Sequence, residues 1–373
     1  MKSVCRILLF LLLLLCPMHV YANETDAVLT LFDFEELDEQ IKDMFPNEKI
    51  TFQHLLNKLM SGEWSELAGM FVQYISDALS YELRHSKNSM IELLVLIITA
   101  TLFSNLANVF QSKQVSEVGF LCIYMMILAI CLKQFQILTD LAAMNVMRIL
   151  EFMKVLAPVY FFAIAISIGS STSVSFYHFI LLLFFVIDLV VLNFLIPMVQ
   201  LYFMMRLLGE FSPEVSLSKF ANFLETMIKG CLKIMTGGAV GANIIQALLV
   251  PTIDALKRGV LLKGGASLPF IGNLFGQTTE ILIGTAVLVK NGIGVVGMIV
   301  CIAMCIGPVI QIGISALMYQ LIAAVLEPVA DKRMVNCISS VGDAGKLLLK
   351  VVYTTALVFL LLMVVVSVTR GGL

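Results

Sequence analysis

Long apolar stretches separated by short polar segments occupy most of the chain, and only the first quarter departs from this pattern. Four apolar stretches cover about residues 90–110, 118–138, 153–169 and 175–204, and others follow between residues 234 and 368. A helix of about 20 apolar residues crosses the hydrocarbon core of a bilayer. The pattern therefore predicts an all-α fold, that of a polytopic helical membrane protein with about six to eight spans.

The first 22 residues have the features of a secretory signal peptide. Two basic residues precede an apolar run at residues 7–15, and Ala22 supplies a small residue at the expected cleavage site before Asn23. We therefore interpret residues 1–22 as a cleaved signal peptide. The alternative is an uncleaved anchor helix, for which the apolar run is short.

Residues 23–89 differ in composition from the rest of the chain, with 13 acidic and 5 basic side chains. Apolar residues recur at the spacing of an amphipathic helix in residues 52–59 and again in residues 71–79. If the signal peptide is cleaved, this region is extracytoplasmic, and its apolar stripes pack on the membrane domain or on a partner. The predicted organisation is an acidic, helical, exported region over residues 23–89, followed by a polytopic membrane domain over residues 90–373.

Prolines and glycines predict interruptions in the apolar helices. Pro197 is expected to kink or tilt the long helix that contains it. Ten glycines between residues 264 and 313 favour tightly packed helices, some of them broken or re-entrant. Gly307 and Pro308 are expected to separate one span from the next. Residues 206–233, where charged and apolar side chains share each turn, are expected to form an amphipathic helix lying at the membrane interface.

Two segments of the second half resemble each other. Residues 243–254 (NIIQALLVPTID) and residues 320–331 (QLIAAVLEPVAD) both end in Pro-x-x-Asp and are followed by a Lys and an Arg. If the two helices run in the same direction, both basic pairs lie on one side, which the excess of positive charge in cytoplasmic loops would make the cytoplasm. A chance similarity between two apolar helix ends explains the match equally well.

Composition excludes several classes of function. Hydrophobic residues make up 60% of the chain, charged residues 13%, and the mean hydropathy is +0.97. This excludes a soluble enzyme, because soluble domains carry about 25% charged residues. A nucleic-acid partner would require a basic face, which the sequence lacks. Phosphate-loop, zinc-protease and serine-hydrolase motifs are absent, and the cysteines and histidines are scattered, so we expect no enzyme activity, no cofactor and no metal site.

A few ionisable residues lie within the apolar stretches, where they are costly and usually face a bundle interior, water or a partner. Asp188 is the most internal, and in a transporter it would be the first choice for a proton or cation site; a carboxyl that hydrogen-bonds a neighbouring helix is the alternative. Glu280 and Lys290 lie ten residues apart, so that each could extend to an interface. A G-x-G-x-x-G match begins at Gly292 and Gly294, in apolar helical sequence, and we assign it to helix packing.

The second half of the chain resembles a known family. Residues 237–258 (GGAVGANIIQALLVPTIDALKR), 271–274 (IGNL) and 279–294 (TEILIGTAVLVKNGIG) are similar to stage III sporulation protein AE. The similarity in layout extends over essentially the whole chain. The candidate intramembrane polar or packing positions are Asp188, Asn243, Gln246, Pro251, Asp254, Glu280, Lys290, Gly292 and Gly294.

The resemblance implies a membrane subunit of the channel or secretion-like complex that connects the mother cell with the engulfed forespore. Its implied location is the outer forespore membrane, with the N-terminal region exported. The implied partners are other membrane subunits of that complex and the lipid bilayer, with a homo-oligomer as a further possibility. Composition alone leaves a different class open, a secondary transporter or permease that uses intramembrane carboxylates such as Asp188.

Overall fold

The computed structural model describes residues 32–44, 51–63, most of 66–80, isolated positions from 84 to 99, and 113–368 without 169, 212–216, 265–271 and 329. The predicted signal peptide, with Ala22 and Asn23, lies outside these residues, as does most of the predicted span at residues 90–110. Every regular element in the described part is a helix, which confirms the all-α prediction.

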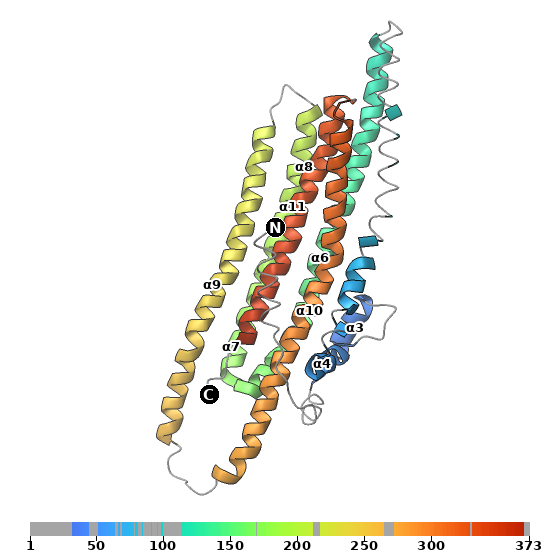
Figure 1. Cartoon of the computed structure of the whole chain (residues 1–373). Coiled ribbons are helices and arrows are strands. Elements are labelled where there is room, and N and C mark those ends of the chain that lie inside the picture. Colours follow the sequence, from blue (N-terminus) through green and yellow to red (C-terminus); the bar gives the residue numbers. More distant parts are fainter. Residues whose placement is uncertain are drawn as a thin grey trace.

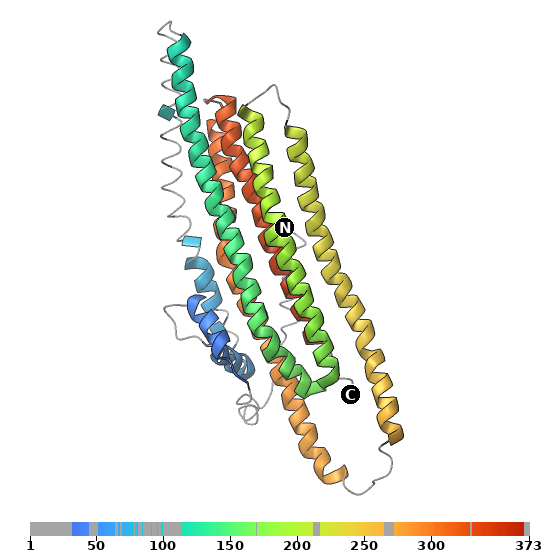
Figure 2. The ribbon, with the colours of Figure 1, turned by 180° about the vertical axis from the view of Figure 1, so that it is seen from behind.

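Long helices that run up and down form the body of the molecule (Figure 1). Helix α10 packs against α11 and α6, and α11 in turn contacts α8 and α9. Seen from behind, α6, α7 and α8 form one side of this bundle (Figure 2). The helices are α6 (Lys113–Ile168), α7 (Ser170–Val190), the π-helix η1 (Val191–Leu195), α8 (Ile196–Phe211), α9 (Ser218–Gly264), α10 (Gly272–Leu326) and α11 (Lys332–Val368).

Four helical segments of the described part are long and apolar enough to cross a membrane. They are Leu121–Ala165, His178–Glu210, Val287–Leu326 and Lys332–Met363. The molecule is thus a helical membrane protein, as predicted. Each of the four exceeds the roughly 20 residues that a bilayer requires.

The two spans expected at residues 118–138 and 153–169 are one helix. Helix α6 has 56 residues and, at 1.5 Å per residue, is about 84 Å long. The prediction of separate spans was wrong because charged residues between 139 and 154 were taken as a polar connection. That segment contains no glycine or proline and is rich in Leu, Met and Ala, which favour a continuous helix.

The structure has an interruption near one of the two prolines and none at the other. Helix α10 continues through Gly307 and Pro308 as one helix of 55 residues, so the predicted division there is wrong. A broken helix would expose backbone N–H and C=O groups in apolar surroundings, and the packing of α10 against two neighbours favours continuity. The irregularity expected near Pro197 is present, because the five-residue π-helix η1 precedes this proline and separates α7 from α8.

Helix α9 does not lie apart from the bundle as an interfacial helix. It is a helix of 47 residues that packs against α8 and α11 (Figures 1 and 2), and residues 206–211 belong to α8, which corrects the prediction for residues 206–233. Leu224 and Ile228 are buried, whereas Phe220, Phe223 and Met227 are exposed. One part of the apolar stripe therefore packs on α8 and α11, and the other part is exposed. The spacing of the apolar residues alone does not distinguish the two parts.

The similar segments at residues 243–254 and 320–331 run in opposite directions. Helices α9 and α10 are connected at the lower end of the bundle in Figure 1, and α10 and α11 at the upper end. Residues 257 and 258 therefore lie toward the lower end, and Lys332 and Arg333 at the upper end. The prediction that both basic pairs lie on one side is wrong, because it assumed two parallel helices.

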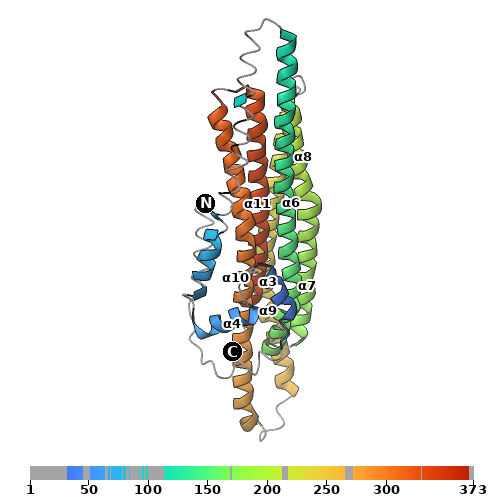
Figure 3. The same ribbon diagram turned by 90° about the vertical axis from the view of Figure 1, so that its right-hand side faces the viewer.

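Two short helices of the acidic region pack on the long bundle (Figure 3). Helix α4 (Phe52–Ser61) begins at the N-cap Thr51, ends at Gly62 with a φ of 80°, and contacts α10. All four predicted apolar positions of this helix, Phe52, Leu55, Leu56 and Leu59, are buried. Helix α3 (Glu35–Met44), which the sequence analysis did not recognise, contacts α6 and α4. Helices α3 and α4 of this region therefore pack on the long bundle.

Aromatic side chains join the acidic region to the bundle. The Phe32 ring meets Phe162 of α6 edge to face at 5.4 Å, and the Phe34 ring stacks on Phe52 of α4 at 5.4 Å between centroids. Burial of one such side chain contributes about 1.5–3 kcal/mol. Lys58, in the last turn of α4, forms an ion pair with Glu66, and its ammonium lowers the pKa of the Glu66 carboxyl.

Candidate functional site

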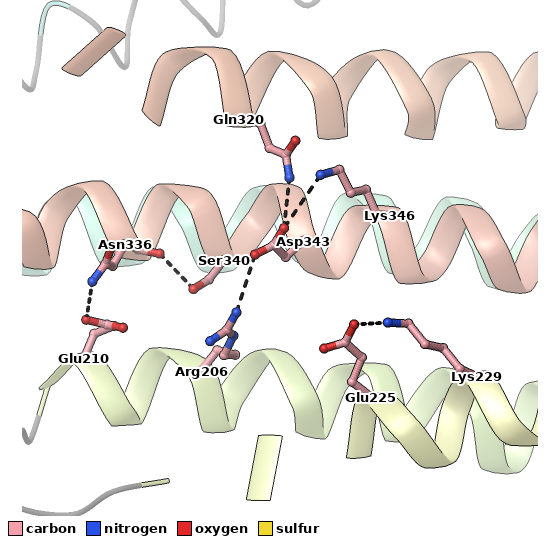
Figure 4. A network of polar contacts seen from close by, with 9 residues as sticks. All are labelled: Arg206, Glu210, Glu225, Lys229, Gln320, Asn336, Ser340, Asp343 and Lys346. Atoms are coloured by element: carbon pink, nitrogen blue, oxygen red, sulfur yellow. Dashed lines mark hydrogen bonds and ion pairs between the residues drawn. The ribbon is translucent and has the colours of Figure 1, made fainter. Parts of the chain in front are cut away.

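Asp343 of α11 is the centre of a polar network between α8, α10 and α11 (Figure 4). Gln320 of α10 donates a hydrogen bond from Nε2 to Asp343 Oδ1 at 2.9 Å. Arg206 of α8 forms an ion pair with Asp343, with 3.6 Å between Nη2 and Oδ2, and Lys346 lies 3.8 Å from Oδ1. One carboxylate thus links three helices. We call Arg206, Gln320, Asp343 and Lys346 the Asp343 network.

A second polar contact joins α8 and α11 nearer to the upper end of the bundle. Asn336 of α11 donates from Nδ2 to Glu210 Oε2 of α8 at 2.8 Å. Arg206 and Glu210 are four residues apart on α8, and Asn336 and Asp343 are seven apart on α11, so each pair shares one helix face. Because the two helices run in opposite directions, both cross-helix contacts form between the same two faces. These bonds fix how far α8 and α11 slide along each other.

Burial and charge determine how strongly this network holds the helices. The side chains of Arg206 and Asp343 are about one-third exposed, at 32% and 34%, so solvent screens their ion pair. The guanidinium carbon also lies 5.8 Å from the centre of the buried Tyr202 ring, a distance at which cation–π attraction acts. No single ion pair of this network contributes much energy. The positions of its hydrogen bonds and ion pairs together therefore define the arrangement of the three helices.

The polar side chains of α9 that lie nearby pair within their own helix. Lys229 forms an ion pair and hydrogen bond with Glu225, one turn earlier on α9 (Figure 4). In the described part of α9, the contacts with α8 and α11 involve the buried apolar residues Ala221, Leu224, Ile228 and Leu232. Helix α9 thus packs through apolar residues, and its Glu225–Lys229 pair lies within the helix.

A buried asparagine links α6 and α10. Asn145, which is 3% exposed, donates from Nδ2 to the backbone oxygen of Met304 at 2.9 Å. A buried polar contact of this kind favours one relative position of two apolar helices, because sliding would leave the amide without a partner.

Glycines bring helices close together at several points of the same bundle. A Cβ atom built on Gly342 of α11 would lie 2.6 Å from Gln320 Cγ and 2.9 Å from the Ala316 backbone oxygen of α10. A Cβ on Gly297 of α10 would lie 2.5 Å from Leu156 Cδ2 of α6. All three distances are shorter than a Cβ atom adopts without a shift of its neighbours. Gly342 therefore allows the approach that places Gln320 beside Asp343.

The sequence-predicted candidates are distributed over the bundle. Asp188 is half-buried on α7, which packs on α6 and meets α11 through the Phe184–Phe359 ring contact. Lys290 is buried on α10, two residues before Gly292, where a Cβ would lie 2.7 Å from Leu56 of α4. Gly292 and Gly294 are both buried, in agreement with a packing role. The backbone of Asn243, Gln246, Pro251 and Asp254 lies on α9 and that of Glu280 on α10, but their side chains lie outside the described residues.

The sequence analysis missed the residues of the Asp343 network. The search for candidates was confined to ionisable residues inside apolar stretches, whereas this network lies where the apolar segments become amphipathic. One signal was available: Asn336, Ser340 and Asp343 recur at i, i+4 and i+7, which places three polar residues on one face of a predicted helix. Their partners on α8 and α10 are far away in sequence and could not be paired from spacing.

The arrangement has the character of a structural site. Its groups are charge pairs and amide hydrogen bonds between helices, and among the described residues no cluster of three His, Cys, Asp or Glu side chains is placed to hold a metal ion. Long apolar helices with cross-helix polar bonds define an integral membrane protein of the helical-bundle class.

Comparison with known proteins gives the family. The model of the family described as stage III sporulation protein AE matches residues 50–370, so the chain belongs to this family. It is similar to stage III sporulation protein AE of Bacillus subtilis (strain 168), with 24% identity over 283 residues, which cover 75% of this chain and 70% of that protein. No solved structure gives a significant match. The resemblance found in residues 237–294 is thereby confirmed.

Proposed function

We propose that the protein is a non-enzymatic membrane subunit of a channel or secretion-like complex that connects the mother cell with the engulfed forespore and is needed for forespore development. Membership of the stage III sporulation protein AE family carries this proposal. The four long apolar helices support the membrane location, and the cross-helix bonds around Asp343 support a structural role.

The proposed location is the outer forespore membrane, with residues 23–89 on the exported side. This orientation depends on the signal peptide expected at residues 1–22. The basic pairs near the end of α9 and at the start of α11 do not determine this orientation, because they lie toward opposite ends of the bundle.

Co-purification tests whether the protein is part of a complex. A tagged copy, expressed from its own promoter in sporulating cells, is solubilised in mild detergent and recovered together with its partners. We expect other membrane proteins of stage III sporulation to be recovered with it reproducibly. A tagged, unrelated polytopic protein of the same cells is the control. Recovery of the tagged protein without any such partner, in several detergents and after cross-linking, would contradict the proposal.

A further inference from the structure

Charged residues of α6 lie together on its outer face. The segment Leu121–Ala165 contains five charged side chains, and every one of them is exposed. Their spacings of three, seven and eight residues place them on one side of the helix. They extend over about 32 Å at 1.5 Å per residue, which is close to the thickness of the hydrocarbon core. These residues, which we call the α6 charged face, are Lys133, Asp140, Arg148, Glu151 and Lys154.

Contacts between helices show which residues of the neighbouring helices lie at the same height along the bundle axis as this face. We call residues at the same height level with each other. At its upper end, the Phe135 ring stacks on Phe203 of α8 with 4.0 Å between centroids. Below its lower end, Leu156 lies against Gly297 of α10, as does Met363 of α11. Met363 is one turn beyond Phe359, whose ring meets Phe184 of α7 at 5.4 Å. The α6 charged face is therefore level with residues 182–204 of α7, η1 and α8.

The outer face of α7, η1 and α8 at this level is mainly apolar. Its exposed positions carry no charged residue. Leu182 and Phe185 are 58% and 61% exposed, and Asn193, Pro197 and Gln200 are the exposed residues that are not large and apolar. Such a surface is suited to lipid. One protomer thus has an apolar outer face and a charged outer face at the same level of the bundle.

Lipid is an unsuitable neighbour for the α6 charged face. Each charged side chain at bilayer depth is costly, and lysine and arginine reduce the cost only by extending to an interface. A stripe as long as the hydrocarbon core cannot place all five members at the interfaces. The carboxylates of Asp140 and Glu151 are also too short to reach far along the helix. Water satisfies both signs of charge on an exposed face.

We propose that the outer face of α6 lines a water-filled space at the depth of the bilayer. The inference rests on the proposed function, because one helix face cannot enclose such a space and the neighbouring subunits of a complex would complete it. The face carries three basic and two acidic groups, which suits an aqueous surface that is not strongly selective for one sign of charge. The apolar face of α7, η1 and α8 then contacts lipid.

Thiol labelling in sporulating membranes tests this inference. Single cysteines are introduced by Asp140→Cys, Glu151→Cys and Met144→Cys on α6, in a full-length background with Cys122→Ser and Cys231→Ser. A charged, membrane-impermeant methanethiosulfonate is the probe. We expect labelling at all three positions, including the apolar Met144, because it shares the exposed face. Leu189→Cys and Leu201→Cys, at the same level on the apolar face, and Ile149→Cys, at a buried position of α6, should remain at background.

Each other outcome overturns the inference. Absence of labelling on α6 with modification by a lipid-soluble maleimide means that the face contacts lipid, and absence with cross-linking to another protein means that a partner covers it. Equal labelling of α6 and of the Leu189 and Leu201 positions places the whole level outside the bilayer. Spore counts of the same strains separate this test from the proposed function. Normal sporulation with an unlabelled α6 would reject the aqueous face of α6 and leave the proposed function intact.

Discussion

Replacing Gly342 with leucine is expected to destabilise the bundle by at least 1–3 kcal/mol, the approximate cost of overpacking a well-packed core. The first side-chain carbon would lie 2.6 Å from Gln320 Cγ and 2.9 Å from the backbone oxygen of Ala316. The backbone atom cannot rotate away, so α10 and α11 must separate. Separation also breaks the hydrogen bond from Gln320 to Asp343. The readout is the thermal unfolding midpoint in detergent and the amount of protein in sporulating membranes.

Gly313→Ala is the matched control for this change. It lies on the same α10–α11 contact, but a Cβ there meets Leu349 at an ordinary 3.7 Å. We expect this variant to be as stable as the wild type or slightly more so, because alanine favours helix over glycine by about 1 kcal/mol. Equal stability of Gly342→Leu and the wild type would show that α10 and α11 do not approach closely at residue 342.

Asp343→Ala is expected to have the second largest effect. It removes the acceptor of Gln320 and the ion-pair partner of Arg206 in one step. A hydrogen bond to a charged group is worth about 1.5–3 kcal/mol. Because Asp343 is one-third exposed, screening reduces the expected loss to about 1–2 kcal/mol. The measurement is again the unfolding midpoint, together with the rate of cross-linking between cysteines placed on α8 and α11.

A double-mutant cycle separates the network from a general effect of losing a charge. Arg206→Ala and Asp343→Ala should together cost less than the sum of the two single changes, because they remove one shared interaction. Glu225→Gln, which removes the ion pair with Lys229 and only a longer-range Coulomb interaction with Arg206, serves as the comparison and should change stability by less than about 0.5 kcal/mol. Strictly additive effects of the Arg206 and Asp343 changes would contradict the pairing of α8 with α11.

Local sequence patterns predicted a helix correctly where the residues of that helix alone determine which of its faces is buried. The stripe at residues 52–59 is a helix whose four apolar residues are buried, because spacing on one helix determines which face is apolar. The same reasoning failed for the limits of α6, since a charged segment was interpreted as a connection. Charge does not end a helix where the charged segment, here residues 139–154, lacks glycine and proline. The direction of a helix depends on how many long helices precede it in the chain. Because this number was not known from the sequence, the two Pro-x-x-Asp segments were predicted to end on the same side.

The candidate site was less predictable than the helices. The packing role predicted for Gly292 remains a prediction, and a Cβ there would lie 2.7 Å from Leu56 of α4. Asp343 was missed, since its meaning depends on Arg206 and Gln320, which reach it only after three helices pack. The charged residues of α6 were visible in the sequence, but their common outward face required the burial pattern of the whole bundle.

Deletion of the gene in its host, followed by imaging through sporulation, tests the central claim most directly. The proposed role predicts that forespores are engulfed normally and then arrest or shrink, and that a wild-type copy restores mature spores. Formation of mature spores at the wild-type frequency without the gene would contradict a required role in forespore development. A secondary transporter with Asp188 as its ion site would then be the hypothesis to examine.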